Sequence, residues 1–333
     1  MIIFKNRASA ILFDVLKSID NNKPFILPAN VCPIVVATFL KAGVNFEFVD
    51  ISKKTLCINE EIILKKIKEF PNFYNGILFV RSYGTEGNFK DFFKKVKDIN
   101  SDIFIIDDCC LNIPKFKNIK TENVDMTLFS TGYSKFADID FGGFAYIRDD
   151  FSYNSRNLTY SKSKLEELVS QFKNVISRNK KFNYEDTNWL DTSKPKISFS
   201  QYKNIINKKI ISIKKRKKKL NDIYSTRLPN KIQLKSKYQN WRFNILVPQK
   251  KELLDKIFSR NLFASSHYAS LDGIFSDGKS INAEKLSSYI VNLFNDKRFN
   301  EEKAEKISRI ISDHCKINGV QNAEIKEFDL VKK

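Results

Sequence analysis

The stretch DMTLFSTGYSKFADIDFGGFAYI, residues 125–147, contains two short apolar runs separated by a loop. The first run covers Met126 to Phe129, and Ser130 follows it directly. Lys135 comes five residues after Ser130, and a Gly-Gly pair precedes the second run, which ends at Ile147. Short apolar runs bounded by turn residues are typical of buried strands. We therefore expect two strands joined by a loop that carries a lysine.

Two interpretations of Lys135 follow from this loop. A lysine held between strands can lose part of its hydration, which favours the neutral amine and covalent bonding to a carbonyl carbon. The alternative is a solvated surface lysine, because the chain contains 58 Lys and Arg residues. Lys135 taken alone favours the second interpretation, so its surroundings have to decide.

The preceding stretch IFIIDDCC, residues 103–110, is an apolar run that ends in two carboxylates. Ligands of open α/β folds bind at the carboxyl ends of parallel strands. Because side chains alternate along a strand, one of Asp107 and Asp108 should face that crevice and the other should face away. The alternative is that these acids are ordinary helix caps.

Apolar strands alternate with helical patterns over the first 150 residues. This alternation predicts an α/β fold with a mainly parallel sheet covered by helices on both faces. The expected strands are 25–27, 46–49, 76–80, 103–106, 126–129 and 143–147, and the expected helices are 8–19, 33–42, 59–70 and 89–96.

The second half has a different pattern. Residues 151–195 are polar and irregular, with one expected helix at 162–175. A long basic helix at 198–224 then leads to a strand at 241–247, a helix at 250–259 and two helices near the end. We predict a large domain at 1–195 and a smaller C-terminal α+β domain at 196–333 that starts with the long basic helix.

The formal net charge of +20 allows two interpretations. A basic chain can bind nucleic acid, and the run from Lys214 to Lys219 would suit that role. However, lysines are scattered along the whole chain, and the run lacks interleaved aromatic residues. We therefore expect a solvated helix face and no nucleic-acid partner, with a positive field that attracts phosphorylated substrates.

Cysteine and histidine contents exclude several classes of site. Five cysteines without framework spacing do not predict disulfides or a structural zinc site. The chain has only two histidines, which argues against a histidine-rich metal site. We also find no apolar stretch of about 20 residues and no signal peptide. The expectation is a soluble cytoplasmic protein with no metal and no membrane partner.

Taken together, these stretches resemble the DegT/StrS-type sugar aminotransferases, which depend on pyridoxal 5'-phosphate (PLP). That family has a strand ending in Glu-Asp-Ala-Ala, then Ser-Phe-x-x-x-Lys, then Gly-Gly and another strand. Residues 27–59, the Tyr83-Gly84 pair and residues 266–271 also match the family pattern in order. The central counterparts here are Asp107-Asp108-Cys109-Cys110, Ser130 through Lys135, and Gly142-Gly143.

The resemblance implies an aspartate-aminotransferase fold and a role for each matched residue. Lys135 would hold the cofactor covalently and then move a proton between substrate and cofactor. Asp108 would pair with the pyridine nitrogen, and Ser130 would bind the cofactor phosphate. Ala8 and Ser9 match the start of the phosphate-binding helix of the family, where free amides and the helix dipole suit an anion.

This sequence departs from the family pattern near the expected cofactor. Arg7 stands at a family glycine, where it would alter the phosphate loop or reach the phosphate itself. Cys32 stands where an aromatic residue usually stacks on the cofactor ring, and Leu111 replaces a glutamine. The segment before the first helix is also shorter than in the family.

Substrate residues are implied less directly. The Asn-x-Arg segment that reaches a neighbouring active site across the family's dimer is not evident, and Lys194 or Lys196 would substitute for it. His267 and Tyr268 match a pair near the family's substrate. The alternative for His267 is a half-buried histidine that packs beside the tyrosine.

The resemblance therefore implies an aminotransferase that moves an amino group, with glutamate as the expected donor, to a nucleotide-linked keto-sugar. Such products serve bacterial surface polysaccharides, and a homodimer is the expected assembly. One alternative is a sugar dehydratase, but those relatives have histidine in place of Lys135. Another is a catalytically altered member that serves as a partner subunit, which Arg7, Cys32 and Leu111 favour.

Overall fold

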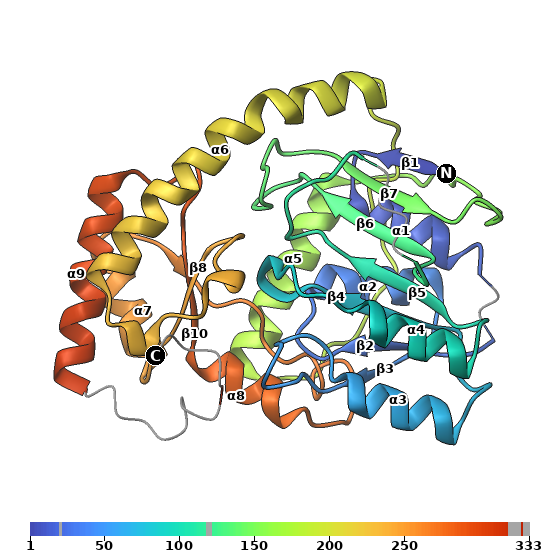
Figure 1. Ribbon diagram of the computed structural model, residues 1–333, viewed down its shortest axis with the longest axis horizontal. Helices are drawn as coiled ribbons and strands as arrows, with labels where there is room; N and C mark the ends of the chain where they lie inside the picture. The colour runs from blue at the N-terminus through green and yellow to red at the C-terminus, as the bar shows by residue number, and fades with distance from the viewer. Residues whose placement is uncertain (20–21, 118–121, 319–327, 329–333) are drawn as a thin grey trace.

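The computed structural model describes residues 1–19, 22–117, 122–318 and 328. Within them, the larger part of the molecule is built on a sheet with the strand order β1-β7-β6-β5-β4-β2-β3 (Figure 1). Strands β2 to β6 run parallel, whereas β7 is antiparallel to β6 and β1 is antiparallel to β7. The strands are β1 (Ile2–Lys5), β2 (Phe25–Pro28), β3 (Phe46–Val49), β4 (Gly76–Val80), β5 (Phe104–Asp108), β6 (Met126–Ser130) and β7 (Gly143–Ile147).

Helices cover both faces of this sheet. Two neighbouring residues of β4 point to opposite faces. Leu78 packs in the core with α1 and α2, and Phe79 packs in the core with α3 and α4. Strands that are buried on both faces are expected to be continuously apolar, as these are. The helices of this part are α1 (Ala8–Leu16), α2 (Pro33–Ala42), α3 (Glu60–Glu69), the short 3-10 helix η1 (Ser82–Gly84), α4 (Lys90–Ile99) and α5 (Lys162–Arg178).

Local sequence signals set several of these helix ends. Helix α2 begins at Pro33, which suits the first turn of a helix, and ends before Gly43, whose φ of 70° is left-handed. The side chain of Asn59 caps α3 by accepting from two backbone amides. These signals are visible in the sequence, and the predicted helices agree with the structure to within a few residues.

Strand β1 is the main element that the sequence analysis missed. It pairs Ile2 with Tyr146 and Lys5 with Gly143, on the edge of the sheet beside β7. The strand is only four residues long, and its partner lies more than 130 residues away in the sequence. A strand this short shows no clear periodicity, and its distant pairing cannot be recognised from the local sequence.

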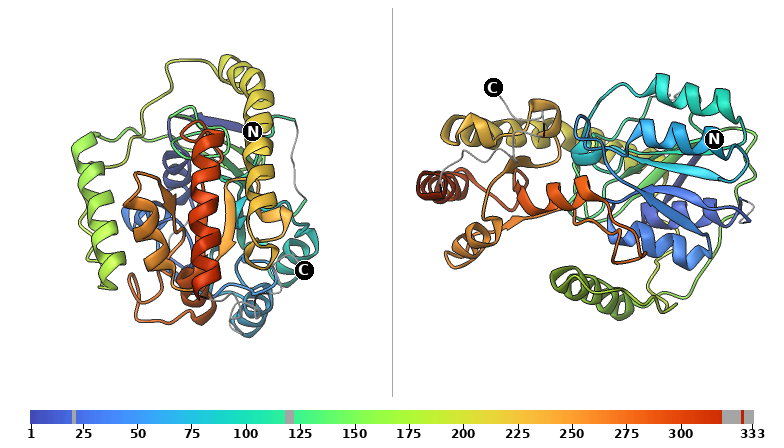
Figure 2. Two further views of the ribbon diagram at one scale, coloured as in Figure 1. Left: turned by 90° about the vertical axis from the view of Figure 1, so that its left-hand side faces the viewer. Right: turned by 90° about the horizontal axis from the view of Figure 1, so that it is seen from below.

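The smaller part of the molecule lies beyond the long helix α6, which runs from the large sheet across to the second sheet (Figures 1 and 2). That second sheet is antiparallel with the order β8-β10-β9, and it packs with α6, α7 and α9 around its own apolar core. The predicted domain boundary between residues 195 and 196 precedes α6 and stays a prediction. The elements are α6 (Phe199–Arg227), η2 (Asn230–Ile232), η3 (Ser236–Tyr238), β8 (Phe243–Leu246), α7 (Lys250–Phe258), β9 (Ala264–Ser265), α8 (Ile281–Tyr289), β10 (Ile290–Leu293) and α9 (Glu301–Asn318).

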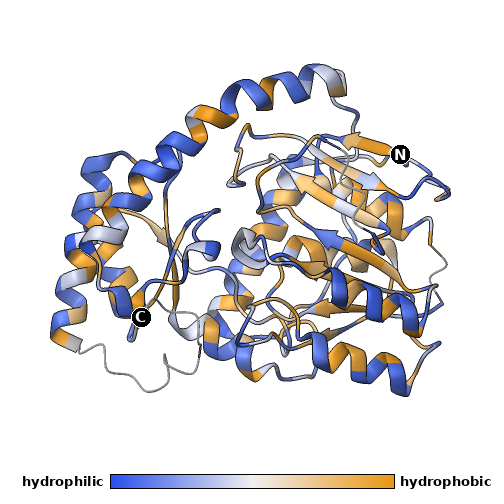
Figure 3. Ribbon diagram, in the orientation of Figure 1, coloured by the Kyte–Doolittle hydropathy of each residue, from blue (hydrophilic) through white to orange (hydrophobic). Residues whose placement is uncertain are grey.

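The basic run on α6 is solvated with one exception. Five of its six side chains are exposed, as expected, but Lys217 is only 5% exposed. Figure 3 shows the same contrast more widely, with hydrophobic residues in the central strands and hydrophilic residues along much of α6. No helix in the described part of the chain is both long and apolar enough to cross a membrane.

A buried ion pair joins β1 to α1. Asp14 of α1 is fully buried, and its Oδ2 lies 3.0 Å from the Nζ of Lys5, which is also buried. Tyr153 donates its hydroxyl to the same carboxylate at 2.5 Å, and the backbone amide of Arg156 donates to it at 3.1 Å. Asp14 therefore connects the edge strand, the first helix and the segment that follows β7.

Asp14→Ala should destabilise the protein strongly, because it leaves the ammonium of Lys5 buried without its carboxylate partner. Breaking a buried pair from one side costs about 3–5 kcal/mol. Urea unfolding followed by circular dichroism measures the loss. Asp98→Ala is the matched control, since Asp98 pairs with Lys94 on the solvated face of α4 and should change the unfolding midpoint little. Equal midpoints for the two variants would contradict this account of Asp14.

Candidate active site

The two adjacent carboxylates at the end of β5 face opposite sides of the sheet. Asp107 accepts two hydrogen bonds of 2.8 Å from the guanidinium of Arg81 on one side. Asp108 lies on the other side, lines a cavity there, and accepts at Oδ1 from the amide of Cys110 at 2.9 Å. This is the division that side-chain alternation requires, and it leaves Asp108 as the acid that faces the cavity.

The cavity lies at the carboxyl ends of the central strands and has a volume of about 480 Å³. That volume is within the usual range for small-molecule sites, about 300–1,000 Å³. It is closed by the start of α1, the start of α2, one side of α5, the segment 189–191 and Tyr268 from the smaller part. The sequence-predicted residues that line it are Arg7, Ala8, Ser9, Cys32, Asp108, Ser130, Lys135 and Tyr268.

Lys135 enters the cavity from the loop between β6 and β7. The loop turns tightly here, because the amide of Lys135 donates to the carbonyl of Gly132 at 3.2 Å. Lys135 and Asp108 are both close to Cys32, the residue before α2. Desolvation raises the pKa of the Cys32 thiol, while the charge of Lys135 lowers it and the charge of Asp108 raises it. An amine, a carboxylate and a small apolar side chain therefore share one end of the cavity.

The other end of the cavity is suited to an anion. Arg7 precedes α1 in an extended conformation, and its Nη1 donates to the carbonyl of Asp140 at 3.0 Å. A Cβ added to Gly132 would lie 3.6 Å from the hydroxyl oxygen of Ser130 and 3.7 Å from Nη1 of Arg7. Gly132 thus keeps open a small space between a hydroxyl and a guanidinium.

Gly143 brings the start of α1 against this space. A Cβ at Gly143 would lie 2.3 Å from the backbone nitrogen of Ala8, so only glycine permits such a close approach of β7. The first amides of a helix lack intrahelical acceptors and carry the positive end of the helix dipole. Ala8 and Ser9 therefore add backbone donors to the side chains of Arg7 and Ser130.

Three predicted substrate residues do not line the cavity. Lys194 and Lys196 are exposed, although Asp191 of the same segment does line it. His267 is also exposed, with its ring 6.1 Å from the ring of Trp241, while its neighbour Tyr268 lines the cavity. Only Tyr268 of the predicted His-Tyr pair therefore lines the cavity, although the two rings lie 5.2 Å apart.

One wall of the cavity was not predicted from the sequence. Leu165 and Val169 come from α5, and their four-residue spacing on an amphipathic helix could have indicated a common face. Trp189 and Leu190 are almost fully buried at the cavity, but they lie in an irregular stretch without periodicity. No periodic pattern or motif in the sequence marks these two residues.

No family model matches the chain, and no curated protein matches it in sequence. Solved structures do match. A protein from Streptococcus pneumoniae assigned as a sugar aminotransferase, in its pyridoxamine-phosphate form, has a TM-score of 0.70 at 15% identity, covering 95% of this chain and 86% of its own.

Two further structures match to a similar extent. The Helicobacter pylori aminotransferase PseC, involved in the biosynthesis of pseudoaminic acid, has a TM-score of 0.66 at 15% identity, covering 93% of this chain and 85% of its own. A DegT/DnrJ/EryC1/StrS aminotransferase from Brucella abortus has a TM-score of 0.65 at 15% identity, covering 94% of this chain and 85% of its own. These likenesses confirm the predicted fold, which is that of PLP-dependent aminotransferases.

Proposed function

We propose that this protein is a PLP-dependent aminotransferase that transfers an amino group from an amino acid to a nucleotide-linked keto-sugar. One observation carries the proposal. The cavity combines Lys135 and Asp108 with a separate anion-binding corner made by Arg7, Ser130 and the start of α1. Solved aminotransferases of the same fold support the same assignment.

The residues present fit the cofactor in charge and in shape. PLP carries a phosphate, an aldehyde and a ring nitrogen. The open space beside Gly132 would take the phosphate, with Arg7 and Ser130 as donors. Lys135 would hold the aldehyde end by its amine, and Asp108 would hold the ring nitrogen. Cys32 would lie against the ring, where its small side chain leaves more room than an aromatic residue.

The chain's own residues then divide the chemistry between them. When bound, PLP supplies an electron sink for the negative charge that develops at the substrate carbon. Asp108 would keep the ring nitrogen protonated, and the amide of Cys110 fixes the orientation of that carboxylate. Lys135, once its amine is released, would act as the base that removes a proton and returns it at a different carbon.

We further propose that glutamate is the donor and that the acceptor is a nucleotide-linked keto-sugar used for bacterial surface polysaccharide. The net charge of +20 favours the approach of a donor carboxylate and a pyrophosphate. The protein would act in the cytoplasm as a homodimer. Lys194 or Lys196, both exposed, would then reach the neighbouring subunit's site, and Tyr268 would contact the substrate.

A half-reaction tests this function without the identity of the sugar. PLP-loaded protein is mixed with glutamate alone, and the absorbance spectrum and 2-oxoglutarate are followed. We expect conversion of the bound cofactor to its pyridoxamine form, with one 2-oxoglutarate released per site. Keto-sugar nucleotides should then restore the first spectrum. Bound PLP that is converted neither by glutamate nor by the other amino acids, each tested in its place, would reject an aminotransferase and favour the altered, non-catalytic partner subunit.

Arg7→Ala should weaken PLP binding, because it removes a cation from the proposed phosphate corner. A hydrogen bond to a charged group contributes about 1.5–3 kcal/mol, which corresponds to about 10- to 150-fold in Kd. Fluorescence titration with PLP measures the change. Lys17→Ala is the matched control, since it removes one positive charge at the far end of α1. If Arg7→Ala binds PLP as tightly as this control, Arg7 does not reach the phosphate.

A further inference from the structure

The residue before Lys135 has an unusual backbone conformation. Ser134 has a φ of 62°, in the left-handed region that residues other than glycine rarely adopt. Such a conformation persists only where the surroundings hold it. Ser134 is bonded directly to Lys135. The contacts that hold Ser134 therefore also fix the backbone position of Lys135.

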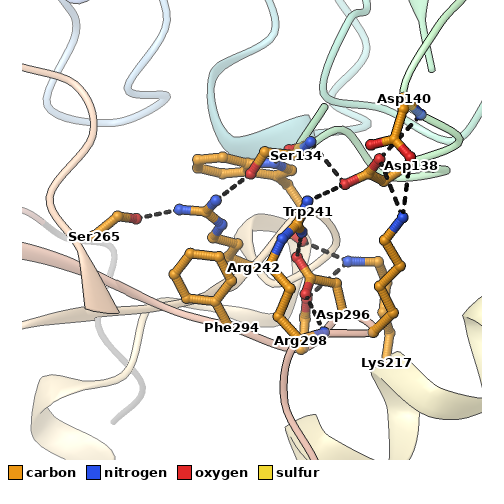
Figure 4. A network of polar contacts seen from close by, with 12 residues as sticks. Ser134, Asp138, Asp140, Lys217, Trp241, Arg242, Ser265, Phe294, Asp296 and Arg298 are labelled. Carbon is orange, nitrogen blue, oxygen red and sulfur yellow. Dashed lines mark hydrogen bonds and ion pairs between the residues drawn. The ribbon is translucent and has the colours of Figure 1, made fainter. Parts of the chain in front are cut away.

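Ser134 is held by all of its polar groups, and two of the three partners come from the smaller part of the molecule (Figure 4). Its carbonyl accepts from Nε1 of Trp241 at 2.6 Å, and its hydroxyl is hydrogen-bonded to the guanidinium of Arg242. Its amide donates to Oδ2 of Asp138 at 2.9 Å. Trp241 and Arg242 immediately precede β8, so the second sheet reaches directly into the Lys135 loop.

Asp138 ties the same loop to the smaller part a second time. Its side chain is only 4% exposed and forms an ion pair with Arg298, which also pairs with Asp296 at 2.6 Å. Desolvation raises the pKa of Asp138, but the Ser134 amide and the Arg298 guanidinium more than offset it, so the net shift is downward. The carboxylate therefore stays ionised and keeps both of its partners.

The contacts of Arg242 suit it to holding a neighbouring hydroxyl group in place rather than to neutralising a carboxylate. It is 4% exposed and lies between the rings of Trp241, at 4.4 Å, and Phe294, at 3.8 Å. Besides Ser134, it bonds to the hydroxyl of Ser265. Among the described residues, no carboxylate forms an ion pair with it. The two rings hold the buried guanidinium in place, and one of its donors points at Ser134.

Lys217 supports this arrangement from α6. Its Nζ donates to the carbonyl of Trp241 and to Oδ1 of Asn295, both at 2.7 Å. This explains why it alone is buried within the basic run. The long helix, β8 and the segment 295–298 thus converge on the loop that carries Lys135 (Figure 4).

We propose that Arg242 is a positioning residue for Lys135, which it fixes through the hydroxyl of Ser134. Lys135 then has its working geometry only when the smaller part of the molecule is docked on the loop. The reactivity of the lysine is thereby coupled to the contact between the two parts. This inference rests on the proposed function, because a fixed position of Lys135 affects the reaction only if this lysine holds the cofactor.

The test uses two variants that cut this hydrogen bond and one that spares it. Ser134→Ala removes only the hydroxyl, and Arg242→Met removes every donor of the guanidinium while its unbranched side chain can still lie between the rings of Trp241 and Phe294. Ser265→Ala is the matched control, because it removes the other hydroxyl partner of the same guanidinium. Each protein is studied with and without PLP, and hydrogen exchange of residues 131–142 reports on the loop.

We expect loop exchange about tenfold faster in Ser134→Ala and Arg242→Met, the equivalent of one charge-assisted hydrogen bond, and unchanged exchange in Ser265→Ala. The glutamate half-reaction should slow about tenfold in the same two variants, with the glutamate concentration at half-maximal rate within about twofold of wild type. A slower rate at an unchanged half-saturating glutamate concentration would indicate a misplaced lysine rather than weaker binding of the donor.

Two results would overturn the inference. Unchanged loop exchange in both variants would mean that the bond does not hold the loop, whatever the activity. A loosened loop with an unchanged half-reaction rate would mean that the hydrogen bond from Arg242 to Ser134 does not position Lys135. Failure of the wild-type protein to bind PLP is a separate result, because it rejects the proposed function. The exchange data still show whether the hydrogen bond from Arg242 to Ser134 holds the loop.

Discussion

Replacing Lys135 by alanine should abolish the covalent attachment of PLP and reduce the glutamate half-reaction by about 10⁴-fold or more. Lys135 would serve both as the residue that holds the cofactor and as the base that moves the proton. Loss of a general base alone costs about 10²–10⁴-fold, and loss of the attachment adds to it. The measurement is stopped-flow absorbance at saturating glutamate, together with intact mass after borohydride reduction.

The same variant should still bind PLP reversibly, because it leaves Arg7 and Ser130, the proposed phosphate-binding residues, unchanged. Lys115→Ala is the matched control, since that lysine lines a different cavity with Arg81 and Asp107. The control should keep both the adduct and the rate. An adduct that survives in Lys135→Ala would place the attachment on another lysine.

Asp108→Asn should reduce the half-reaction by about 10²–10³-fold, the usual cost of removing one preorganised electrostatic partner. Asparagine has the same shape, and its side-chain oxygen can still accept from the amide of Cys110. The loss would therefore report the missing charge opposite the ring nitrogen rather than a rearranged site. Rapid mixing with glutamate gives the rate, and PLP titration shows that binding is retained.

The neighbouring residue gives a control for the same change. Asp107→Asn alters the carboxylate that pairs with Arg81 on the other side of the sheet. It should lower the free energy of unfolding but leave the rate per folded, PLP-loaded molecule near that of wild type. If both substitutions slow the half-reaction equally, or if neither does, Asp108 has no special role at the ring nitrogen.

The sequence predicts the parallel core of the fold well, because its signals are local. Apolar runs bounded by helices or loops mark β2 to β7, and the alternation rule correctly separates Asp107 from Asp108. The resemblance to the DegT/StrS-type family carries the fold, which the solved structures confirm at 12–16% identity. Apart from Tyr268, the predicted site residues that line the cavity lie on or next to these strands and the helices that join them, and their roles stay predictions.

The remaining features depend on contacts between distant parts of the chain. The bond from Arg242 to Ser134 joins residues 108 positions apart, and the bond from Lys217 to Asn295 joins residues 78 apart. Lys217 has basic neighbours on both sides, so its burial is invisible in the charge pattern. Trp189 lies in an irregular stretch and is buried by tertiary contacts alone.

The central claim is that Lys135 is the residue that holds PLP, and peptide mapping tests it most directly. PLP-loaded wild-type protein is reduced with borohydride, digested and analysed by tandem mass spectrometry. We predict one stable pyridoxyl group per chain, located on Lys135. A label on a different lysine, or no label on protein that is saturated with PLP, would contradict the account.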